Sequence, residues 1–463
     1  MRLEEIIGIV REYFSLALLA VIALGMIYFL IYFIVYKRLF KGKRTLPKKQ
    51  MLLLGMFMGY VIMVIGVTFL IRGPNYHSGI DLSLFSSYRE AWYQFSIRHW
   101  QFIYLNIFMF VPFGILFPLL HPRFRKAVWT IGGAALFTLS IESVQLITGY
   151  GNFVVDDLFN NFLGATIGYG ITMGFISIKD KKIKRFFYYL SPLLLVIIFS
   201  GSMFTYYHSK EFGNLSIVPT HKIDMRPAAI TTNVELNDSG KTVPIYKAPS
   251  YSKSAADEFV QDFFGRIQEG PSDMEDISYP DLAMYRINGE NSYNMSFQFL
   301  DGSYSFTDFS ILDPGIKLTD VDEETLEENL MKFGIEIPQE AKFQKSDTGV
   351  YEWTVDKKVM KNQLIDGAVK ASYYNDHTVK EIENQLVIYD KVRDVQIKSE
   401  QEAYQEILVG KFQVYAENNK IDSLQIHKVW VSYYLDSKSY YQPVYAFQST
   451  VDEMDMIILV PGI

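Results

Sequence analysis

The most regular feature of the chain is a series of long apolar runs in its N-terminal part. Each run is about 20 residues long, the length that an α-helix needs to cross the hydrocarbon core of a bilayer. The runs cover residues 15–36, 51–71, 102–120, 127–147, 158–178 and 186–206. The pattern therefore predicts a membrane all-α bundle of about six transmembrane helices in residues 1–206.

Beyond residue 206 the long apolar runs end and shorter amphipathic segments follow. We interpret residues 207–250 as a linker with scattered short strands. In residues 251–463 the periodicity predicts helices and strands in alternation. Helices are expected at 254–267, 325–334 and 399–411, and strands near 351–355, 368–373, 385–389, 423–435, 443–450 and 456–460. This pattern predicts an α+β domain of repeated helix-plus-sheet units.

Local signals support several of these boundaries. Asn288-Gly289 and Asp301-Gly302 are dipeptides typical of tight hairpins. Ser399 followed by Glu402 matches a capping box, in which each residue satisfies a backbone N–H group at the start of a helix. We therefore expect a helix to begin directly after Ser399.

Basic residues in the short loops predict the orientation of the bundle. Lysine and arginine crowd residues 37–49, 123–126 and 179–185, and the loops between these are much poorer in basic residues. Basic loops of membrane proteins remain in the cytoplasm. We therefore expect a multi-pass protein of the cell membrane, with the N-terminus, the C-terminus and the α+β domain outside the cytoplasm.

Composition excludes several functions. The net charge of −7 argues against a nucleic acid as partner. The chain has no cysteine, which excludes disulfides and thiol chemistry. No nucleophile elbow or phosphate-binding loop is present, and His77 and His99 lack the spacing of metal ligands. We therefore expect no metal and no cofactor.

Polar residues inside three of the apolar runs are the candidate functional site. A carboxylate near the hydrocarbon core costs about 2–4 kcal/mol, so three neighbouring segments with such residues indicate a site. The candidate ligand-binding residues are Asn106, Glu142, Gln145, Asp156, Asp157 and Asn161. Of these, Glu142 is the candidate general base if the protein is an enzyme.

Helical spacing groups these residues into faces. Thr138, Glu142 and Gln145 are spaced i, i+4, i+7, and a second row runs from Asp157 through Asn161 to two glycines, Gly164 and Gly168. Small residues four apart allow another helix to approach closely. If the two rows face each other, Glu142 meets the Asp/Asn cluster in one pocket. Alternatively, the polar residues only bond to one another and hold the bundle together.

The same residues resemble a known family. The ordered pattern is Asn106…Phe110-x-Pro112-x-Gly114, then Glu142-x-x-Gln145, then Asp156-Asp157-x-x-x-Asn161-x-x-Gly164. It is similar to that of VanZ-like membrane proteins, whose namesake is associated with resistance to teicoplanin, a lipid-tailed glycopeptide. The resemblance covers roughly the first 180 residues. We assign Pro112 and Gly114 to helix packing, together with Gly164 and Gly168.

Two positions depart from the family pattern. An Asn-Leu-x-Pro-Phe segment is common in the preceding loop, and this chain has Asp81-Leu82-Ser83-Leu84-Phe85 without the proline. A basic residue commonly precedes the Asp-Asp pair, and this chain has Asn152 there. The loop geometry and any contact of that base with an anion are therefore expected to differ.

The C-terminal end offers a weaker similarity. The segment from Tyr440 to Phe447 resembles PepSY-type modules and exported regulators of wall-sensing kinases. Nearby tyrosines, such as Tyr433, Tyr434 and Tyr441, can stack on a glycan or fill the face of a sheet.

Three functions are consistent with these observations. The first is a non-enzymatic or weakly enzymatic envelope protein that binds an amphiphile, a cell-wall precursor or a lipoglycopeptide at the outer leaflet and contributes to teicoplanin tolerance. Its expected partners are membrane lipids and an envelope protein. The second is an intramembrane enzyme acting on lipid-linked wall intermediates. The third is a membrane-anchored sensor whose outer domain performs the recognition.

Overall fold

The structure is a computed structural model that describes residues 47–70, 79–94, 97–267, 274–279, 281–288, 292–414 and 420–463. The apolar run at 15–36, most of the first basic loop and His77 lie outside the described residues. The chain divides into a helical unit, which comprises the residues up to Ala91 and Ile97–Lys210, and a sheet unit, which comprises Glu211–Ile463 together with residues 92–96. We describe each unit by itself.

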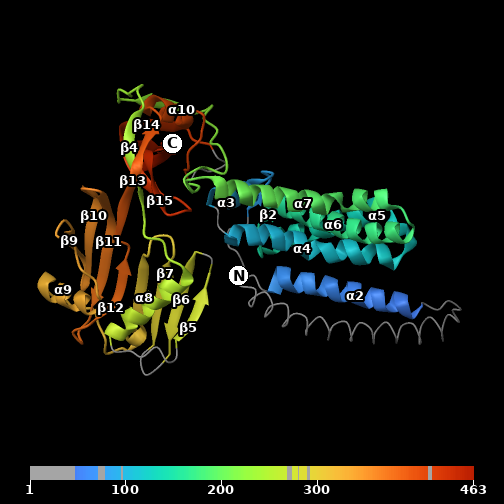
Figure 1. The fold of residues 1–463 in the computed structure, drawn as a ribbon, viewed down its shortest axis with the longest axis horizontal. Helices are drawn as coiled ribbons and strands as arrows, with labels where there is room; N and C mark the ends of the chain where they lie inside the picture. Colours follow the sequence, from blue (N-terminus) through green and yellow to red (C-terminus); the bar gives the residue numbers. More distant parts are fainter. Residues whose placement is uncertain are drawn as a thin grey trace. The chain divides into compact units, whose positions relative to one another are not determined.

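Five helices of the described residues are long and apolar enough to cross a membrane (Figure 1). They are α2 (Lys48–Ile65), α4 (Ile97–Leu120), α5 (Ala127–Thr148), α6 (Val155–Lys179) and α7 (Ile183–Ser209). They correspond to the last five apolar runs of the sequence, so the protein is a membrane protein. The total of six spans stays a prediction.

Short elements connect these helices. A π-helical turn, Gly66–Leu70, continues α2, and α3 (Ser86–Gln94) precedes α4. The 3-10 turn Pro122–Arg125 lies between α4 and α5. Strand β1 (Ile80–Asp81) pairs in parallel with β2 (Phe153–Val154), directly before α6.

The main difference from the expected helix boundaries is at the N-terminal ends. Helix α4 begins at Ile97 and α6 at Val155, several residues before the apolar runs begin. Backbone hydrogen bonding continues through polar residues, whereas hydropathy does not. As a result Asp156 and Asp157 lie in the first turn of α6, where the helix dipole favours negative charge.

Glycines bring α4 and α6 into backbone contact. A Cβ atom added to Gly164 would lie 1.9 Å from the Ile107 carbonyl oxygen, and one added to Gly168 would lie 2.0 Å from that of Val111. From the other side, a Cβ atom on Gly114 would lie 2.1 Å from the Ala165 oxygen. Such an approach is possible only without side chains, and it makes α6 the central helix, in contact with α4, α5 and α7.

The sheet unit contains a 14-stranded sheet (Figure 1). Its strands are β3 (Ala229–Thr232), β4 (Lys241–Lys247), β5 (Met274–Ser278), β6 (Leu282–Ile287), β7 (Tyr293–Gln298), β8 (Tyr304–Asp308), β9 (Lys342–Asp347), β10 (Val350–Met360), β11 (Gln363–Tyr373), β12 (Val379–Asn384), β13 (Val387–Ile397), β14 (Ser423–Leu435), β15 (Tyr440–Val451) and β16 (Met454–Pro461). Its main path runs β3-β14-β15-β4-β13-β11-β12-β8-β7-β6-β5, with β9, β10 and β16 attached beside it. A large, sheet-rich C-terminal part is thus confirmed.

Three helices accompany this sheet, each followed in sequence by antiparallel strands. They are α8 (Lys253–Arg266), α9 (Glu323–Lys332) and α10 (Glu400–Leu408). The capping box of Ser399 and Glu402 is formed at the start of α10, and Gly302 has a φ of +77° in the turn between β7 and β8. Whether the three helix-and-strand groups repeat one unit stays a prediction. Strands β3 and β4, within the expected linker, belong to the sheet.

Two hydrophobic cores lie on this sheet. Helices α8 and α9 bury aromatic and aliphatic side chains, such as Phe263 and Leu330, against strands β6 to β8 and β10 to β12. Helix α10 covers a second core built from β14, β15 and β16, which includes Ile407 and Phe447. Between them, a smaller cluster holds Tyr389 stacked on Tyr441 with ring centroids 4.1 Å apart.

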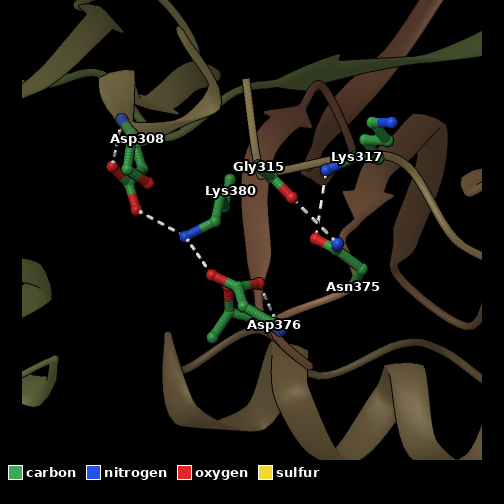
Figure 2. A network of polar contacts seen from close by, with 8 residues as sticks. Asp308, Gly315, Lys317, Asn375, Asp376 and Lys380 are labelled. Carbon is green, nitrogen blue, oxygen red and sulfur yellow. Dashed lines mark hydrogen bonds and ion pairs between the residues drawn. The ribbon is translucent and has the colours of Figure 1, made fainter. Parts of the chain in front are cut away.

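A buried network of ion pairs lies beside the paired strands β8 and β12 (Figure 2). The ammonium of Lys380, which is 5% exposed, lies 2.8 Å from Asp376 and 3.2 Å from Asp308. Burial lowers the pKa of Lys380, but the two carboxylates outweigh it and raise that pKa. Beside it, the Asn375 side chain bonds to the Gly315 oxygen and accepts from the Lys317 amide at 3.0 Å each. The network therefore fixes the loop between β8 and α9.

Candidate functional site

The contact that locates the site joins α5 to α6. The Asn161 amide donates to the Thr138 hydroxyl at 2.9 Å, and both side chains are buried. The two helices are consecutive and joined by the short segment 149–154, so they run in opposite directions. One turn toward that connection lie Glu142 on α5 and Asp157 on α6. The spacing of the sequence therefore places the two carboxylates at the same level of the bundle.

Glu142 lies between two polar contacts of α5. One turn below it is Thr138, and one turn above it the Gln145 amide donates to the Thr68 carbonyl oxygen at 3.1 Å. That oxygen belongs to the π-helical turn after α2. Glu142 is 4% exposed and Gln145 is 3% exposed. The polar row of α5 thus faces α2 and α6 and not the surface.

Asp156 has a different environment from Asp157. It is fully buried and accepts hydrogen bonds from the Ser87 amide at 2.8 Å, the Phe85 amide and the Ser86 hydroxyl. These donors open α3, so Asp156 acts on α3 as a capping residue does, although it lies on α6. The adjacent Asp157 accepts from the Asn106 side chain of α4 at 2.5 Å.

Two interleaved rows on α6 explain this division. Asp156 and Asn160 are four residues apart and both contact α3, because the Tyr88 hydroxyl donates to the Asn160 oxygen. Asp157 and Asn161 form the next row and contact α4 and α5. Asn160 was not among the candidate residues, although its i+4 spacing from Asp156 indicates that the two side chains share a face.

The row from Asp157 to Gly168 on α6 contacts two neighbouring helices. Asn161 bonds to Thr138 of α5, whereas Gly164 and Gly168 pack on the α4 backbone near Gly114. The physical reason is that one row of side chains along α6 can contact two neighbouring helices. At the two glycines no side chain intervenes, so the backbone of α4 can approach that of α6 closely. Pro112 lies inside α4, in the same region of that helix.

The loop before α3 is ordered by hydrogen bonds to acidic and amide groups. Asp81 accepts from the Ser83 amide and the Ser86 hydroxyl at 2.8 Å each. Asn152 accepts from the Gly79 amide at 3.0 Å. At the two positions that depart from the family pattern, the chain therefore uses Asp81 and Asn152 to bind its own backbone and side chains.

Several buried polar atoms have no hydrogen-bond partner among the described residues. They include the Asn161 Oδ1, the Asn160 Nδ2 and the Tyr60 hydroxyl on α2. Tyr60 packs in the same core as Ala134, one turn before Thr138, and Ala165, one turn after Asn161. Unsatisfied buried groups are costly unless water or a ligand reaches them. Among the described residues, no group of three His, Cys, Asp or Glu side chains could hold a metal ion.

The tyrosines of the sheet unit have partners within that unit. Tyr441 stacks on Tyr389, and Tyr433 packs on Tyr441 and Tyr246. The Tyr434 hydroxyl bonds to Ser216, and the Tyr440 ring contacts Phe212. They fill the sheet face and the segment after α7, which favours the packing interpretation.

Comparison with solved structures found matches at low identity and low TM-score. An uncharacterized protein from Eubacterium rectale ATCC 33656 matches with a TM-score of 0.27 and 10% identity, over 50% of this chain and 86% of the other. The Bacillus megaterium YpeB C-terminal domain matches with a TM-score of 0.21 and 9% identity, over 46% of this chain and 94% of the other. No curated protein matches the sequence.

A family comparison covers the helices that carry the site. The model of the VanZ/LLP1 family matches residues 57–177, a range that begins within α2 and ends within α6. It includes each of the candidate residues from Asn106 to Gly168. The N-terminal part of the chain is therefore a VanZ-like domain.

Proposed function

We propose that this protein is a multi-pass envelope protein with both termini and the sheet unit outside the cytoplasm. The alternation of basic loops supports this orientation. In it, the start of α4, the end of α5 and the start of α6 lie at the outer surface. Asn106, Glu142 and Asp157 then lie within the outer leaflet, about one turn or more below its surface.

In this proposal the VanZ-like domain binds the polar part of an amphiphile at the outer leaflet. The observation that carries it is the set of buried polar atoms between α2, α5 and α6 that have no partner among the described residues. Asn161 offers an acceptor oxygen, and the Tyr60 hydroxyl can donate or accept. A head group with hydroxyl or amide groups satisfies such atoms, and the acyl chain remains in the bilayer.

The family resemblance supports a specific class of ligand. The namesake of the VanZ-like family is associated with resistance to teicoplanin, which carries a lipid tail. Candidate ligands are therefore lipoglycopeptides themselves or the lipid-linked wall precursors that they recognise. Binding either one at the outer leaflet lowers the amount of drug-bound precursor, and this does not require catalysis.

The test is Glu142→Gln in the full-length protein, expressed in a teicoplanin-sensitive host. The substitution keeps the shape and hydrogen bonding of the side chain but removes its charge. We expect teicoplanin tolerance to fall to the level of cells without the protein, while the amount of folded protein and its Tm stay unchanged. Ser140→Ala, at an exposed position of the same helix, is the matched control and should keep full tolerance.

Full tolerance with Glu142→Gln would contradict a site that depends on this charge. Intramembrane hydrogen bonds contribute only about 0.6 kcal/mol on average, so a structural network should accept the amide. Glu142→Ala also leaves a cavity, and its Tm should fall under either interpretation. Lipid identification on purified wild-type and Glu142→Gln protein then names the ligand.

A further inference from the structure

The β10–β11 hairpin of the sheet unit ends in an exposed surface that includes apolar side chains. Residues 358–363 are all exposed. The exposed fraction is 54% for Val359 and 39% for Met360. Lysines flank these two apolar side chains, and among the described residues neither Lys358 nor Lys361 forms an ion pair. We call residues 358–361 the hairpin tip.

Strand register places apolar side chains on both faces of the hairpin tip. Lys358 pairs with Ile365, which in turn pairs with Ile388 of β13, where the side chain is 47% exposed. Directly opposed residues share a face, and residues two apart along a strand also share it. Met360 and Ile388 therefore lie on one face and Val359 on the other.

This distribution favours one kind of partner. A protein that docks on a sheet contacts one face, whereas a bilayer surrounds a tip that enters it end-first. In segments that insert into a membrane surface, cationic side chains flank the apolar residues and lie at the level of the head groups. Lys358 and Lys361 flank Val359 and Met360 in the same way. The tip is locally basic in a chain with a net charge of −7.

The base of the hairpin is held firmly. A β-bulge interrupts the pairing between Val355 and Lys358, and Asp366 binds the amide of Lys357 at 3.1 Å and its ammonium at 3.3 Å. The Tyr441 hydroxyl also donates to Asp366. At the other end, the Lys391 amide of β13 donates to the Asn362 oxygen at 2.7 Å. The exposed apolar side chains are thus presented on a rigid support.

The turn itself uses a residue that is unfavourable there. Lys361 has a φ of +55°, a conformation that glycine adopts without cost and other residues rarely adopt. Among the described residues, the Lys361 ammonium forms no ion pair that offsets this conformation. Strain of this kind occurs where a side chain is needed for an external contact.

We propose that the hairpin tip inserts into the surface of an anionic phospholipid bilayer. Val359 and Met360 enter the boundary between head groups and acyl chains, and Lys358 and Lys361 bind lipid phosphates. Only Lys210 separates the end of α7 from the sheet unit, so the tether keeps the tip at a high effective concentration near a membrane. A weak contact is therefore sufficient.

The chain has no cysteine, so one label can be introduced at one position. The full-length protein with Val359→Cys, labelled with bimane, is placed in nanodiscs that contain brominated lipid. One set is made of phosphatidylcholine alone, and the other contains an equal part of phosphatidylglycerol. Val409→Cys is the matched control, because Val409 is 51% exposed and lies just after α10.

We expect brominated lipid to quench the label at position 359 in the anionic nanodiscs, less in phosphatidylcholine, and not at position 409. Lys358→Ala with Lys361→Ala should lower the ratio of inserted to free tip by about five-fold per lysine. Unchanged thermal unfolding of each variant shows that the sheet unit is intact. Absence of quenching at 359, equal quenching at 359 and 409, or quenching independent of the lysines would each overturn the proposal.

Discussion

The helical unit and the sheet unit are stabilised by opposite means. In the helical unit, the closest contacts are those between backbones, where Gly164 and Gly168 remove side chains so that α4 and α6 touch. In the sheet unit, large aromatic side chains such as Phe263, Tyr285 and Trp353 fill the core. Lipid offers no hydrophobic driving force between helices, whereas water drives the burial of aromatic surface. A side chain added at a glycine should therefore destabilise the helical unit. Loss of a side-chain contact should destabilise the sheet unit.

The largest effect is expected from Gly164→Ala. The new methyl group would lie 1.9 Å from the Ile107 carbonyl oxygen, which belongs to a helix backbone and cannot move aside alone. We expect a loss of about 3 kcal/mol or more, because α4 and α6 must separate. The measurement is the Tm and folded yield of the full-length protein in detergent.

A second glycine provides the control for this change. Gly132 lies in α5, and a Cβ atom added there meets nothing within 4 Å. Gly132→Ala should leave the Tm unchanged or raise it slightly, because alanine favours the helix by about 0.5–1 kcal/mol. Equal Tm values for the two variants would show that backbone contact does not hold the helical unit together.

This comparison also explains which features could be predicted from the sequence. Apolar runs and 3.6-residue periodicity depend on local physics, so five spans and the helices α8, α9 and α10 were predicted within a few residues of their ends. Strand β14 was predicted with its observed limits, 423–435. Strand β12 and helix α3 were missed, because β12 has four charged or amide residues among six and α3 lies in a loop rich in aromatic residues.

The partners of the polar residues could not be predicted from spacing alone. Helical geometry placed Asp157 and Asn161 on one face, but it did not show that α4 binds the first and α5 the second. The same limit applies to Asp156, whose donors are about 70 residues away in the sequence. Such pairings depend on tertiary packing, which brings Gln145 to the turn after α2 and Thr138 to α6.

In the sheet unit, Lys380→Met tests how much a single buried side-chain contact contributes to stability. The change leaves Asp308 and Asp376 without their buried cation, and we expect a loss of about 3 kcal/mol in the free energy of unfolding. Lys345→Met is the control, because that lysine and Asp320 are about half exposed and solvent screens their pair, so this change should have a much smaller effect. The measurement is urea unfolding of the full-length protein, followed by tryptophan fluorescence.

The pH dependence gives a second readout of this network. Burial raises the pKa of Asp376, but hydrogen bonds from Lys380 and Thr378 outweigh it, and the net pKa is lowered from 3.8. A lowered pKa stabilises the fold above the ordinary value, and this contribution is lost as the pH falls below about 3.8. Lys380→Met should therefore reduce the acid sensitivity of the sheet unit. An unchanged acid profile would contradict the role of the ion pair.

The smallest effect is expected from Asp156→Ala. This change tests whether Asp156, a buried charge of the helical unit, has a structural role like that of Lys380 in the sheet unit. Asp156 accepts from the amides of Phe85 and Ser87 at the start of α3. Its loss leaves these donors unsatisfied, and replacement of a capping carboxylate costs about 0.5–2 kcal/mol. We expect a small decrease in Tm and faster hydrogen exchange confined to the amides of residues 85–94.

Asp156→Asn distinguishes the cap from a binding charge. The amide keeps one acceptor oxygen, so part of the protection at residues 85–94 should return, and teicoplanin tolerance should follow that protection if Asp156 acts only through α3. Tolerance lost in Asp156→Asn with normal exchange at these amides would mean that the charge itself binds the ligand. Asp156 would then belong with Glu142, because both carboxylates would act on the ligand and neither would be part of the scaffold.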